Sequence, residues 1–223
     1  MHIGIIMDGN RRWAKNMGKS SFYGHNAGFK NAENIVNLSF IKGVKQITLW
    51  ALSKENLEKR DIDEINGIIK LIDKFVDFLP MFKKHQAKFE TIGDISKLPE
   101  KTRKILQKMK DETSIFQEKI ITIALVYSGQ DEIVRATKKI ISQNIDPNSL
   151  DEKKFRKYLD TYFLSPIDLI IRTGGDFRHS GFTLYDSAYS EYYFSSKFWP
   201  EFDEKELNNA LNSYSKSDRR FGK

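Results

Sequence analysis

The chain has 223 residues, of which 39% are hydrophobic and 30% are charged, so it has enough apolar material for a globular core and lacks the composition of a disordered protein. It contains no cysteine, which excludes disulfide bonds and zinc–thiolate sites and agrees with a reducing compartment. No apolar run approaches the roughly 18 residues that would span a bilayer. The net charge of +7 favours polyanionic partners, although scattered surface lysines would give the same total.

The organisation of the chain predicts a single domain over residues 1–223. The sequence shows no internal repeat, no low-complexity segment and no linker, and its first six residues lack the basic leader of a signal peptide. We therefore expect a cytoplasmic protein that meets any lipid from the aqueous side.

Short apolar runs alternate with helical patterns along the chain. The runs typical of strands are residues 3–7, 46–52, 87–93, 120–127, 167–171 and 192–194. Helices are predicted over residues 26–41, 61–82, 99–110 and 130–142, and capping patterns at Asp61-x-x-Glu64, Ser149-x-x-Glu152 and Asp203-x-x-Glu206 mark helix starts. This alternation predicts an α/β fold with a mostly parallel central sheet of about six strands flanked by helices. Ligands of such sheets bind beyond the carboxyl ends of the strands, which selects residues 8–10, 53–56 and 172–176.

The segment after the first strand has a carboxylate followed by basic residues only. Asp8 ends the strand, the next carboxylate is Glu33, and between them lie Arg11, Arg12, Lys15, Lys19 and Lys30. This arrangement suits a hard cation on Asp8 that bridges to phosphate, with arginines and backbone N–H groups on the remaining oxygens. The alternative is a plain Asp-Gly-Asn turn beside a solvated basic pair. His25 follows this loop and is either structural or a phosphate contact or proton relay.

Three further segments carry candidate groups. Arg172, Arg178 and Ser180 flank a glycine turn and would surround a second diphosphate, unless the turn carries incidental charges. Ser53 and Asn56 would bind a substrate oxygen or relay a proton, unless they only begin a helix. Glu191 stands among aromatic residues as a surface charge or as a second carboxylate for the metal.

The predicted helix over residues 61–82 has an unusually wide apolar face. Its stripe of isoleucine, phenylalanine, valine and leucine exceeds what one packed face needs. The excess would meet the core and a partner subunit, or an apolar substrate.

Five segments occur in a fixed order: Asp8-Gly9-Asn10-Arg11-Arg12-Trp13-Ala14, Gly24-His25-x-x-Gly28, Ser53-x-Glu55-Asn56, Arg172-Thr173-Gly174-Gly175 and Glu191-Tyr192-Tyr193-Phe194-x-x-x-x-Trp199-Pro200. Together they resemble the motifs of the cis-prenyltransferases, and most closely those of the bacterial undecaprenyl diphosphate synthases. With Arg219-Arg220-Phe221-Gly222 near the end, the likeness covers essentially the whole chain.

The resemblance implies an α/β homodimer in which a hydrophobic tunnel holds a growing prenyl chain. It implies Mg²⁺-dependent condensation of farnesyl diphosphate with successive isopentenyl diphosphates, each new double bond being cis. The expected product is a long-chain polyprenyl diphosphate, with undecaprenyl diphosphate foremost, the precursor of the lipid carrier for peptidoglycan and other cell-wall glycans. Peripheral contact with a membrane for product release is expected, and no nucleic acid.

The resemblance also assigns roles to residues. Asp8 would hold Mg²⁺ at the allylic diphosphate, and Glu191 is the second residue linked to the metal. The residues expected to act in catalysis are Asp8, His25, Ser53 and Asn56. Those expected to bind substrate are Gly9, Asn10, Arg11, Arg12, Trp13, Lys19, His25, Ser53, Glu55, Asn56, Leu57 and Lys59 together with Arg172, Arg178 and Ser180 at the isopentenyl diphosphate. The C-terminal Arg219-Arg220-Phe221-Gly222 would reach across the dimer.

Some positions depart from the family pattern. Ser21 replaces a common arginine, Leu57 replaces a common tryptophan, and Lys59 and Arg60 are both candidates for a displaced arginine. Asp176 stands where glutamate is common, and residues 127–130 read Tyr-Ser-Gly-Gln in place of Tyr-Gly-Gly-Arg. No departure removes a metal or leaving-group residue, so we expect activity. The competing classes are a nucleic-acid-binding module, for which no known motif is present, and a diphosphate-binding phosphatase.

Overall fold

The computed structural model describes residues 1–217, and its centre is one sheet of six strands. The strands are β1 (His2–Ile6), β2 (Gln46–Ser53), β3 (Ala87–Ile92), β4 (Lys119–Tyr127), β5 (Leu169–Arg172) and β6 (Glu191–Phe194). Their order across the sheet is β3-β4-β2-β1-β5-β6, and every neighbouring pair is parallel. The six predicted strands and the α/β class are therefore confirmed.

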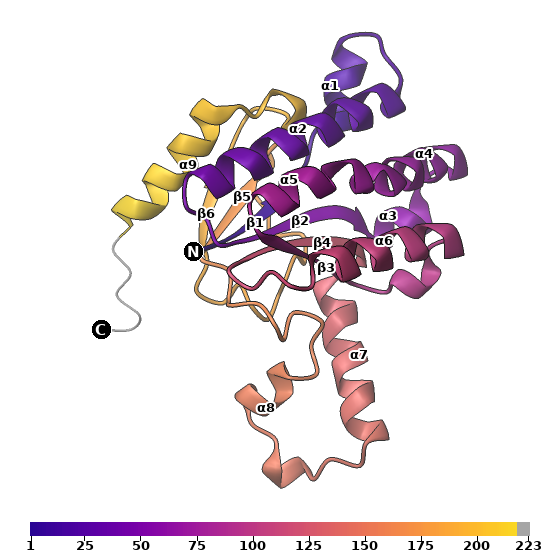
Figure 1. Cartoon of the computed structure of the whole chain (residues 1–223), viewed down its shortest axis with the longest axis vertical. Coiled ribbons are helices and arrows are strands. Elements are labelled where there is room, and N and C mark those ends of the chain that lie inside the picture. The colour runs from indigo at the N-terminus through magenta and orange to yellow at the C-terminus, as the bar shows by residue number, and fades with distance from the viewer. Residues whose placement is uncertain (218–223) are drawn as a thin grey trace.

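Helices cover both faces of the sheet, as the alternating pattern predicted. They are α1 (Asn10–Asn16), α2 (Ser21–Ile41), α3 (Lys54–Lys59), α4 (Ile62–Asp73), α5 (Leu79–Lys84), α6 (Glu100–Thr113), α7 (Gly129–Ser142), α8 (Glu152–Arg156) and α9 (Glu204–Lys216), with short 3-10 turns η1 (Lys74–Phe78), η2 (Ile95–Lys97), η3 (Pro147–Ser149) and η4 (Trp199–Glu201). Figure 1 shows α2, α4 and α5 together over one face, whereas α7 and α8 extend on the other side.

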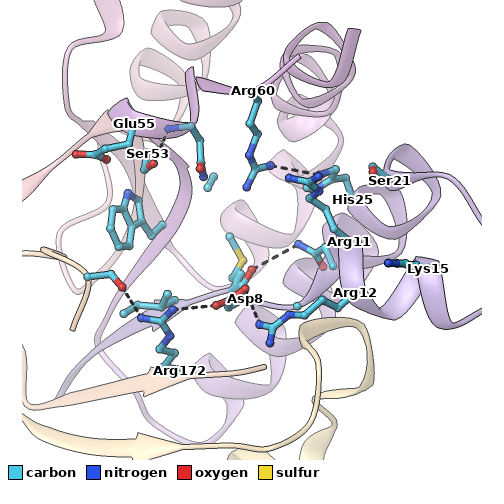
Figure 2. A pocket seen from close by; sticks show the side chains of 18 of the residues that line it. Asp8, Arg11, Arg12, Lys15, Ser21, His25, Ser53, Glu55, Arg60 and Arg172 are labelled. Atoms are coloured by element: carbon cyan, nitrogen blue, oxygen red, sulfur yellow. Dashed lines mark hydrogen bonds and ion pairs between the residues drawn. The ribbon is translucent and has the colours of Figure 1, made fainter. Parts of the chain in front are cut away.

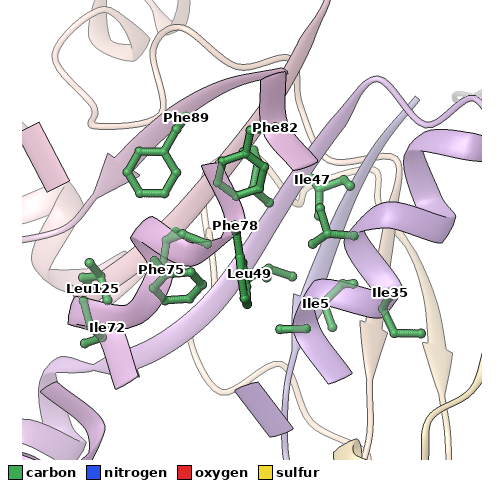
Figure 3. Packing of buried hydrophobic residues seen from close by; sticks show 14 of the residues in the cluster. Ile5, Ile35, Ile47, Leu49, Ile72, Phe75, Phe78, Phe82, Phe89 and Leu125 are labelled. Atoms are coloured by element: carbon green, nitrogen blue, oxygen red, sulfur yellow. The ribbon is translucent and has the colours of Figure 1, made fainter. Parts of the chain in front are cut away.

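The larger core lies between the sheet and the helices α2, α4, α5, α6 and α9. Figure 3 shows its centre, where Phe75, Phe78 and Phe82 meet strand residues. Phe78 and Phe82 are 2% and 1% exposed, and Phe82 stacks on Phe89 of β3 with ring centroids 5.9 Å apart. A smaller cluster that includes Ile170 and Phe182 covers the opposite face.

The predicted continuous helix over residues 61–82 was wrong. The segment forms α4, the 3-10 turn η1 and then α5. Pro80 explains the break, because proline has no N–H to bond to the carbonyl oxygen of Val76 and its ring obstructs a regular helix there. In the 3-10 turn, residues three apart lie above one another, which sends both Phe75 and Phe78 into the core. Much of the excess apolar face therefore belongs to the core of this chain.

Helix starts were predicted less well than strands. Helices α1 and α3 were not predicted, and α2 begins at Ser21, five residues before the expected start. Asp203 caps α9 as expected, but α8 is capped by Asp151 and not by Ser149. Asp61 caps α4 by accepting a hydrogen bond from the N–H of Asp63, while the Glu64 side chain of the expected capping box bonds elsewhere.

Candidate active site

A pocket of about 950 Å³ opens at the carboxyl ends of β1, β2 and β5, where the parallel sheet was predicted to bind its ligand. It brings together many of the predicted site residues, as Figure 2 shows. Those that line it are Asp8, Gly9, Asn10, Arg11, Arg12, Lys19, His25, Ser53, Glu55, Asn56, Arg172 and Ser180. Lys15, Ser20, Ser21 and Arg60 line it as well, so cations outnumber carboxylates and the pocket suits an anion.

Asp8 lies between two arginines at the floor of this pocket. Its Oδ2 accepts a hydrogen bond from Nη2 of Arg172 at 2.9 Å, and its Oδ1 is 3.1 Å from Nη2 of Arg12. The Asp8 side chain is 30% exposed, whereas Arg172 is 4% exposed. The carboxylate is therefore held in a fixed place while it still faces the pocket.

The backbone after β1 places Asp8 with little freedom. Gly9 has φ of +103°, and a Cβ at this position would lie 2.5 Å from the ring of Phe198. The carbonyl oxygen of Asp8 accepts hydrogen bonds from the N–H of Trp199 at 3.0 Å and from the hydroxyl of Thr173 at 2.7 Å. Only glycine fits this conformation and this close approach, which is why the chain turns at once from β1 into α1.

The glycines after Asp8 bring α1 close to α2. A Cβ on Gly24 would lie 2.1 Å from the carbonyl oxygen of Asn10, and a Cβ on Gly28 would lie 2.3 Å from its side-chain oxygen. Gly24 was interpreted as a loop residue, whereas Gly28 fell in the helix predicted over residues 26–41; both lie inside α2 and permit the two helices to touch. The close contact sets Arg11 of α1 beside His25 of α2.

Arg172 is the centre of a second group of polar contacts in the pocket. Its Nη1 donates to Oγ of Ser180 and to the carbonyl oxygen of Arg178, each at 2.6 Å. Asp176 completes this group by pairing with Arg12 at 3.1 Å and with Arg178 at 2.9 Å. Arg172 and Ser180 thus sit together as predicted, and Asp176 orients arginines.

Ser53 and Asn56 meet at the start of α3. Oγ of Ser53 accepts a hydrogen bond from the N–H of Asn56 at 3.0 Å, so the helix-cap alternative is confirmed. Both residues also line the pocket, so the cap is compatible with the alternative of a binding role.

Glu64 is a site residue that the sequence interpretation missed. Its Oε1 accepts hydrogen bonds from Nη1 of Arg60 at 2.8 Å and from Nε2 of His25 at 2.9 Å. Burial lowers the pKa of the His25 imidazole, and the charges of Arg60 and Arg11 lower it further against the raising effect of Glu64. The spacing Asp61-x-x-Glu64 had pointed to a helix cap, and no local signal revealed the contact with His25, which is 39 residues away.

A family model described as "Putative undecaprenyl diphosphate synthase" matches residues 6–222. The chain belongs to the cis-prenyltransferase family. A ditrans,polycis-undecaprenyl-diphosphate synthase, (2E,6E)-farnesyl-diphosphate specific, from Wigglesworthia glossinidia brevipalpis is 39% identical over 100% of this chain and 87% of that protein. A tritrans,polycis-undecaprenyl-diphosphate synthase, geranylgeranyl-diphosphate specific, from Picrophilus torridus is 40% identical over 99% of this chain and 89% of that protein.

Solved cis-prenyltransferase structures share the fold. Lavandulyl diphosphate synthase from Lavandula x intermedia, in complex with dimethylallyl diphosphate, superposes with a TM-score of 0.94 at 32% identity and covers 100% of this chain and 98% of that one. A probable undecaprenyl diphosphate synthase from Campylobacter jejuni superposes with a TM-score of 0.82 at 29% identity, with coverage of 100% and 98%. The resemblance found in the sequence motifs is therefore confirmed at the level of family and fold.

Some residues predicted from the cis-prenyltransferase motifs do not line the pocket. Trp13 stacks on Tyr23 with ring centroids 5.7 Å apart, and Leu57 packs against the main core. Lys59 is exposed on α3, and the Arg178 side chain is 61% exposed and pairs with Asp176. In this structure Arg60, and not Lys59, supplies the cation that follows the Ser-x-Glu-Asn motif.

Glu191 lies far from Asp8 within one chain. It begins β6 in register with Leu169, at the opposite end of β5 from Arg172, and three residues along a strand span roughly 10 Å. Among residues 1–217, no group of three or more His, Cys, Asp or Glu side chains is placed to hold a metal. The Arg219-Arg220-Phe221-Gly222 motif lies outside the described residues.

A smaller apolar cavity of about 60 Å³ adjoins the polar pocket and shares Met7, Asn10, His25 and Ala51 with it. Its other walls come from α2, α4 and η1 and include Phe29, Ile68, Leu71, Ile72 and Phe75. The wide apolar face of residues 61–82 therefore meets a cavity as well as the core. No helix among residues 1–217 combines the length and apolarity required to cross a membrane.

Proposed function

We propose that this cis-prenyltransferase condenses farnesyl diphosphate with successive isopentenyl diphosphates, in a Mg²⁺-dependent reaction, to a long-chain polyprenyl diphosphate such as undecaprenyl diphosphate. The observation that carries the proposal is Asp8, held between Arg12 and Arg172 in an anion pocket that adjoins an apolar cavity. The pocket suits a diphosphate, and the apolar cavity offers contacts to the first part of a prenyl chain. The printed specificity of the Wigglesworthia relative supports farnesyl diphosphate as the starting substrate.

The residues at the floor of the pocket fit a magnesium ion. Mg²⁺ is usually bound by one or two carboxylates together with substrate phosphates and water, and Asp8 offers such a carboxylate, 30% exposed, beside phosphate-binding arginines. When bound to Asp8, the ion would neutralise charge that develops on the leaving diphosphate. Arg12 and Arg172 supply the same kind of stabilisation from fixed positions.

The reaction then follows from the placement of two diphosphates. The bond between the allylic carbon and its diphosphate oxygen breaks, and pyrophosphate leaves with the bonding electrons. The isopentenyl double bond attacks the allylic carbon, a carbon–carbon bond forms, and a proton is lost to give the new double bond. Arg172 with Ser180 would hold the isopentenyl diphosphate beside the allylic one, and such positioning is a large part of the catalysis. His25, Ser53 with Asn56, and a phosphate oxygen are the candidate proton acceptors.

Incubation with farnesyl diphosphate, labelled isopentenyl diphosphate and MgCl₂, followed by sizing of the lipid product, tests the proposal. A ladder of products that each differ by one isoprene unit, abolished by EDTA and restored by Mg²⁺, is expected. Release of inorganic phosphate without chain growth would instead identify a phosphatase. A salt-dependent gel shift on RNA or DNA without prenyl transfer would identify a nucleic-acid-binding protein.

We further propose a cytoplasmic homodimer that touches a membrane when it releases its product for cell-wall lipid-carrier synthesis. Glu191 reaches an Asp8 site only if a second copy of the chain brings it there, and a homodimer supplies such a copy. Light scattering coupled to size-exclusion chromatography measures this directly, and a mass of one chain at micromolar concentration would contradict the dimer.

A further inference from the structure

One carboxylate oxygen behind the wall of the main pocket gathers three basic side chains. Oε1 of Glu64 accepts from Arg60 at 2.8 Å and from His25 at 2.9 Å, and it lies 3.8 Å from Nε of Arg11. All three partners line the pocket, whereas Glu64 itself does not. The Glu64 side chain is only 12% exposed.

The four residues come from four different elements. Arg11 is on α1, His25 is on α2, Arg60 is the C-cap of α3, and Glu64 is in the first turn of α4. Figure 2 shows Arg60, His25 and Arg11 converging along one side of the pocket, across from Arg172. Glu64 therefore connects the segments that carry these groups.

The hydrogen bond to Glu64 determines which ring nitrogen of His25 carries the proton. Burial opposes ionisation of Glu64, but the hydrogen bond from His25 and the charges of Arg60 and Arg11 hold the pKa of its carboxyl below the ordinary value. An ionised carboxylate only accepts, so the 2.9 Å contact with Glu64 assigns the proton to Nε2 of His25 in preference to the longer contact of Nε2 with Nη1 of Arg60 at 3.4 Å. Because the pKa of His25 is lowered, the ring is neutral at pH 7 and Nδ1 keeps its lone pair.

We infer that Glu64 is a positioning residue, which presents Arg60 to the diphosphate and holds His25 in the Nε2–H tautomer at the wall of the pocket. The inference rests on the proposed function, because it concerns the same pocket. A free arginine loses side-chain entropy when it binds phosphate, and an arginine already ordered by Glu64 loses less. Arg60 is therefore the phosphate-binding cation for which the sequence offered both Lys59 and Arg60 as candidates.

The sign of one binding measurement separates this role from a simple charge effect. A carboxylate that acted only through its charge would repel an anion, so its removal would tighten anion binding. A positioning carboxylate has the opposite effect, since its loss releases Arg60. The probe is inorganic pyrophosphate, titrated calorimetrically into the full chain and its variants.

Two variants test the position of the carboxylate as well as its charge. Glu64→Gln keeps the shape and loses the charge, and Glu64→Asp keeps the charge but withdraws the oxygens by about 1.5 Å. Both are expected to weaken pyrophosphate binding about tenfold at a temperature where thermal unfolding shows them folded. Unchanged or tighter binding in Glu64→Gln, or wild-type binding in Glu64→Asp, would overturn the inference.

A matched control comes from α6. Glu112 also accepts from lysines, with Lys83 at 2.6 Å, but lies outside the pocket. Glu112→Gln is expected to leave pyrophosphate binding and turnover unchanged. In an Arg60→Met background, Glu64→Gln is expected to weaken pyrophosphate binding by less than a further twofold. The effects of two residues that act through one contact are not additive. If the losses of pyrophosphate-binding free energy in the two single variants added fully in the double variant, the positioning role of Glu64 would be contradicted.

The ring nitrogens of His25 give a readout that a purely structural role would not move. Glu64 raises the pKa of His25, so Glu64→Gln should shift its titration in ¹⁵N NMR spectra to lower pH and increase the Nδ1–H tautomer. An unchanged His25 titration would count against the inference. The binding and NMR measurements on Glu64 do not need turnover. A chain that forms no polyprenyl product would therefore refute the proposed function, and the role of Glu64 in pyrophosphate binding would still be decided by these measurements alone.

Discussion

The polar side chains at the two ends of β1 differ in their exposure. Just beyond the carboxyl end, Asp8 is 30% exposed and faces a pocket of about 950 Å³. At the other end, His2 is 1% exposed, with Nδ1 2.7 Å from the carbonyl oxygen of Ser165 and Nε2 2.8 Å from the hydroxyl of Thr48. A polar residue at a strand end thus serves binding where it faces a cavity, and serves stability where protein atoms enclose it.

The comparison predicts that substitutions at the two ends of β1 affect different properties, activity at one end and stability at the other. Changes beyond the carboxyl end should cost activity and leave stability nearly intact, because Asp8 already contacts solvent. Changes at the amino end should do the reverse, since the polar groups around His2 would be left without partners.

Asp8→Ala should give the largest effect. We expect turnover to fall about 1,000-fold or more, because the substitution removes the carboxylate that is proposed to hold Mg²⁺ and that pairs with both Arg12 and Arg172. The chain should stay folded, because Asp8 is partly exposed and the buried Arg172 keeps its hydrogen bonds to Ser180 and to the carbonyl oxygen of Arg178. Product formation from labelled isopentenyl diphosphate and urea denaturation test the two expectations. Activity within tenfold of wild type would remove Asp8 from the mechanism.

Protonation of His2 should give the next largest effect, and it should change the stability of the protein but not its activity. Burial is the main reason that its pKa is lowered from 6.5 to about 4. The folded state therefore disfavours a proton that the unfolded chain accepts below pH 6.5. Stability is fully present above pH 6.5 and is lost as pH falls toward 4, by about 3 kcal/mol at most for this shift.

Comparison with His2→Asn isolates that contribution, since the other groups titrate in both proteins. The unfolding free energy of the wild type should fall more steeply between pH 7 and pH 4 than that of the variant. Turnover of the folded variant at pH 7.5 should match the wild type. Parallel pH profiles would show that His2 does not set the acid limit.

Arg172→Lys changes a residue of the pocket and should give a smaller loss of activity than Asp8→Ala. Lysine keeps the charge but cannot contact Asp8 and Ser180 at once, as the guanidinium does at 2.9 and 2.6 Å. We expect kcat/KM for isopentenyl diphosphate to fall about 100-fold, as for a lost bidentate contact to a developing or bound anion. A loss below fivefold would show that charge alone suffices there.

The sheet was predictable from the sequence because most of its strands are short, mainly apolar runs between helical patterns, such as residues 120–127. The pocket was predictable because parallel strands end at one edge. Glu64 was not, since its partner His25 is distant in sequence and its spacing from Asp61 fits a helix cap. The misplaced start of α2 has a similar cause, because Gly24 suggests a loop until its close approach to Asn10 is seen.

Ser53 offers the smallest and most diagnostic test, because it lies at the carboxyl end of β2 and also caps α3. Ser53→Ala removes the acceptor for the N–H of Asn56 and should lower the unfolding free energy by about 1 kcal/mol. Ser53→Asp keeps a capping oxygen, so it should recover that stability, but it adds a negative charge to an anion pocket and should raise KM for both diphosphates. If Ser53→Ala instead lost more than 100-fold in kcat with unchanged stability, the hydroxyl would be part of the proton transfer. In that case β2 would contribute to catalysis as directly as β1 does through Asp8.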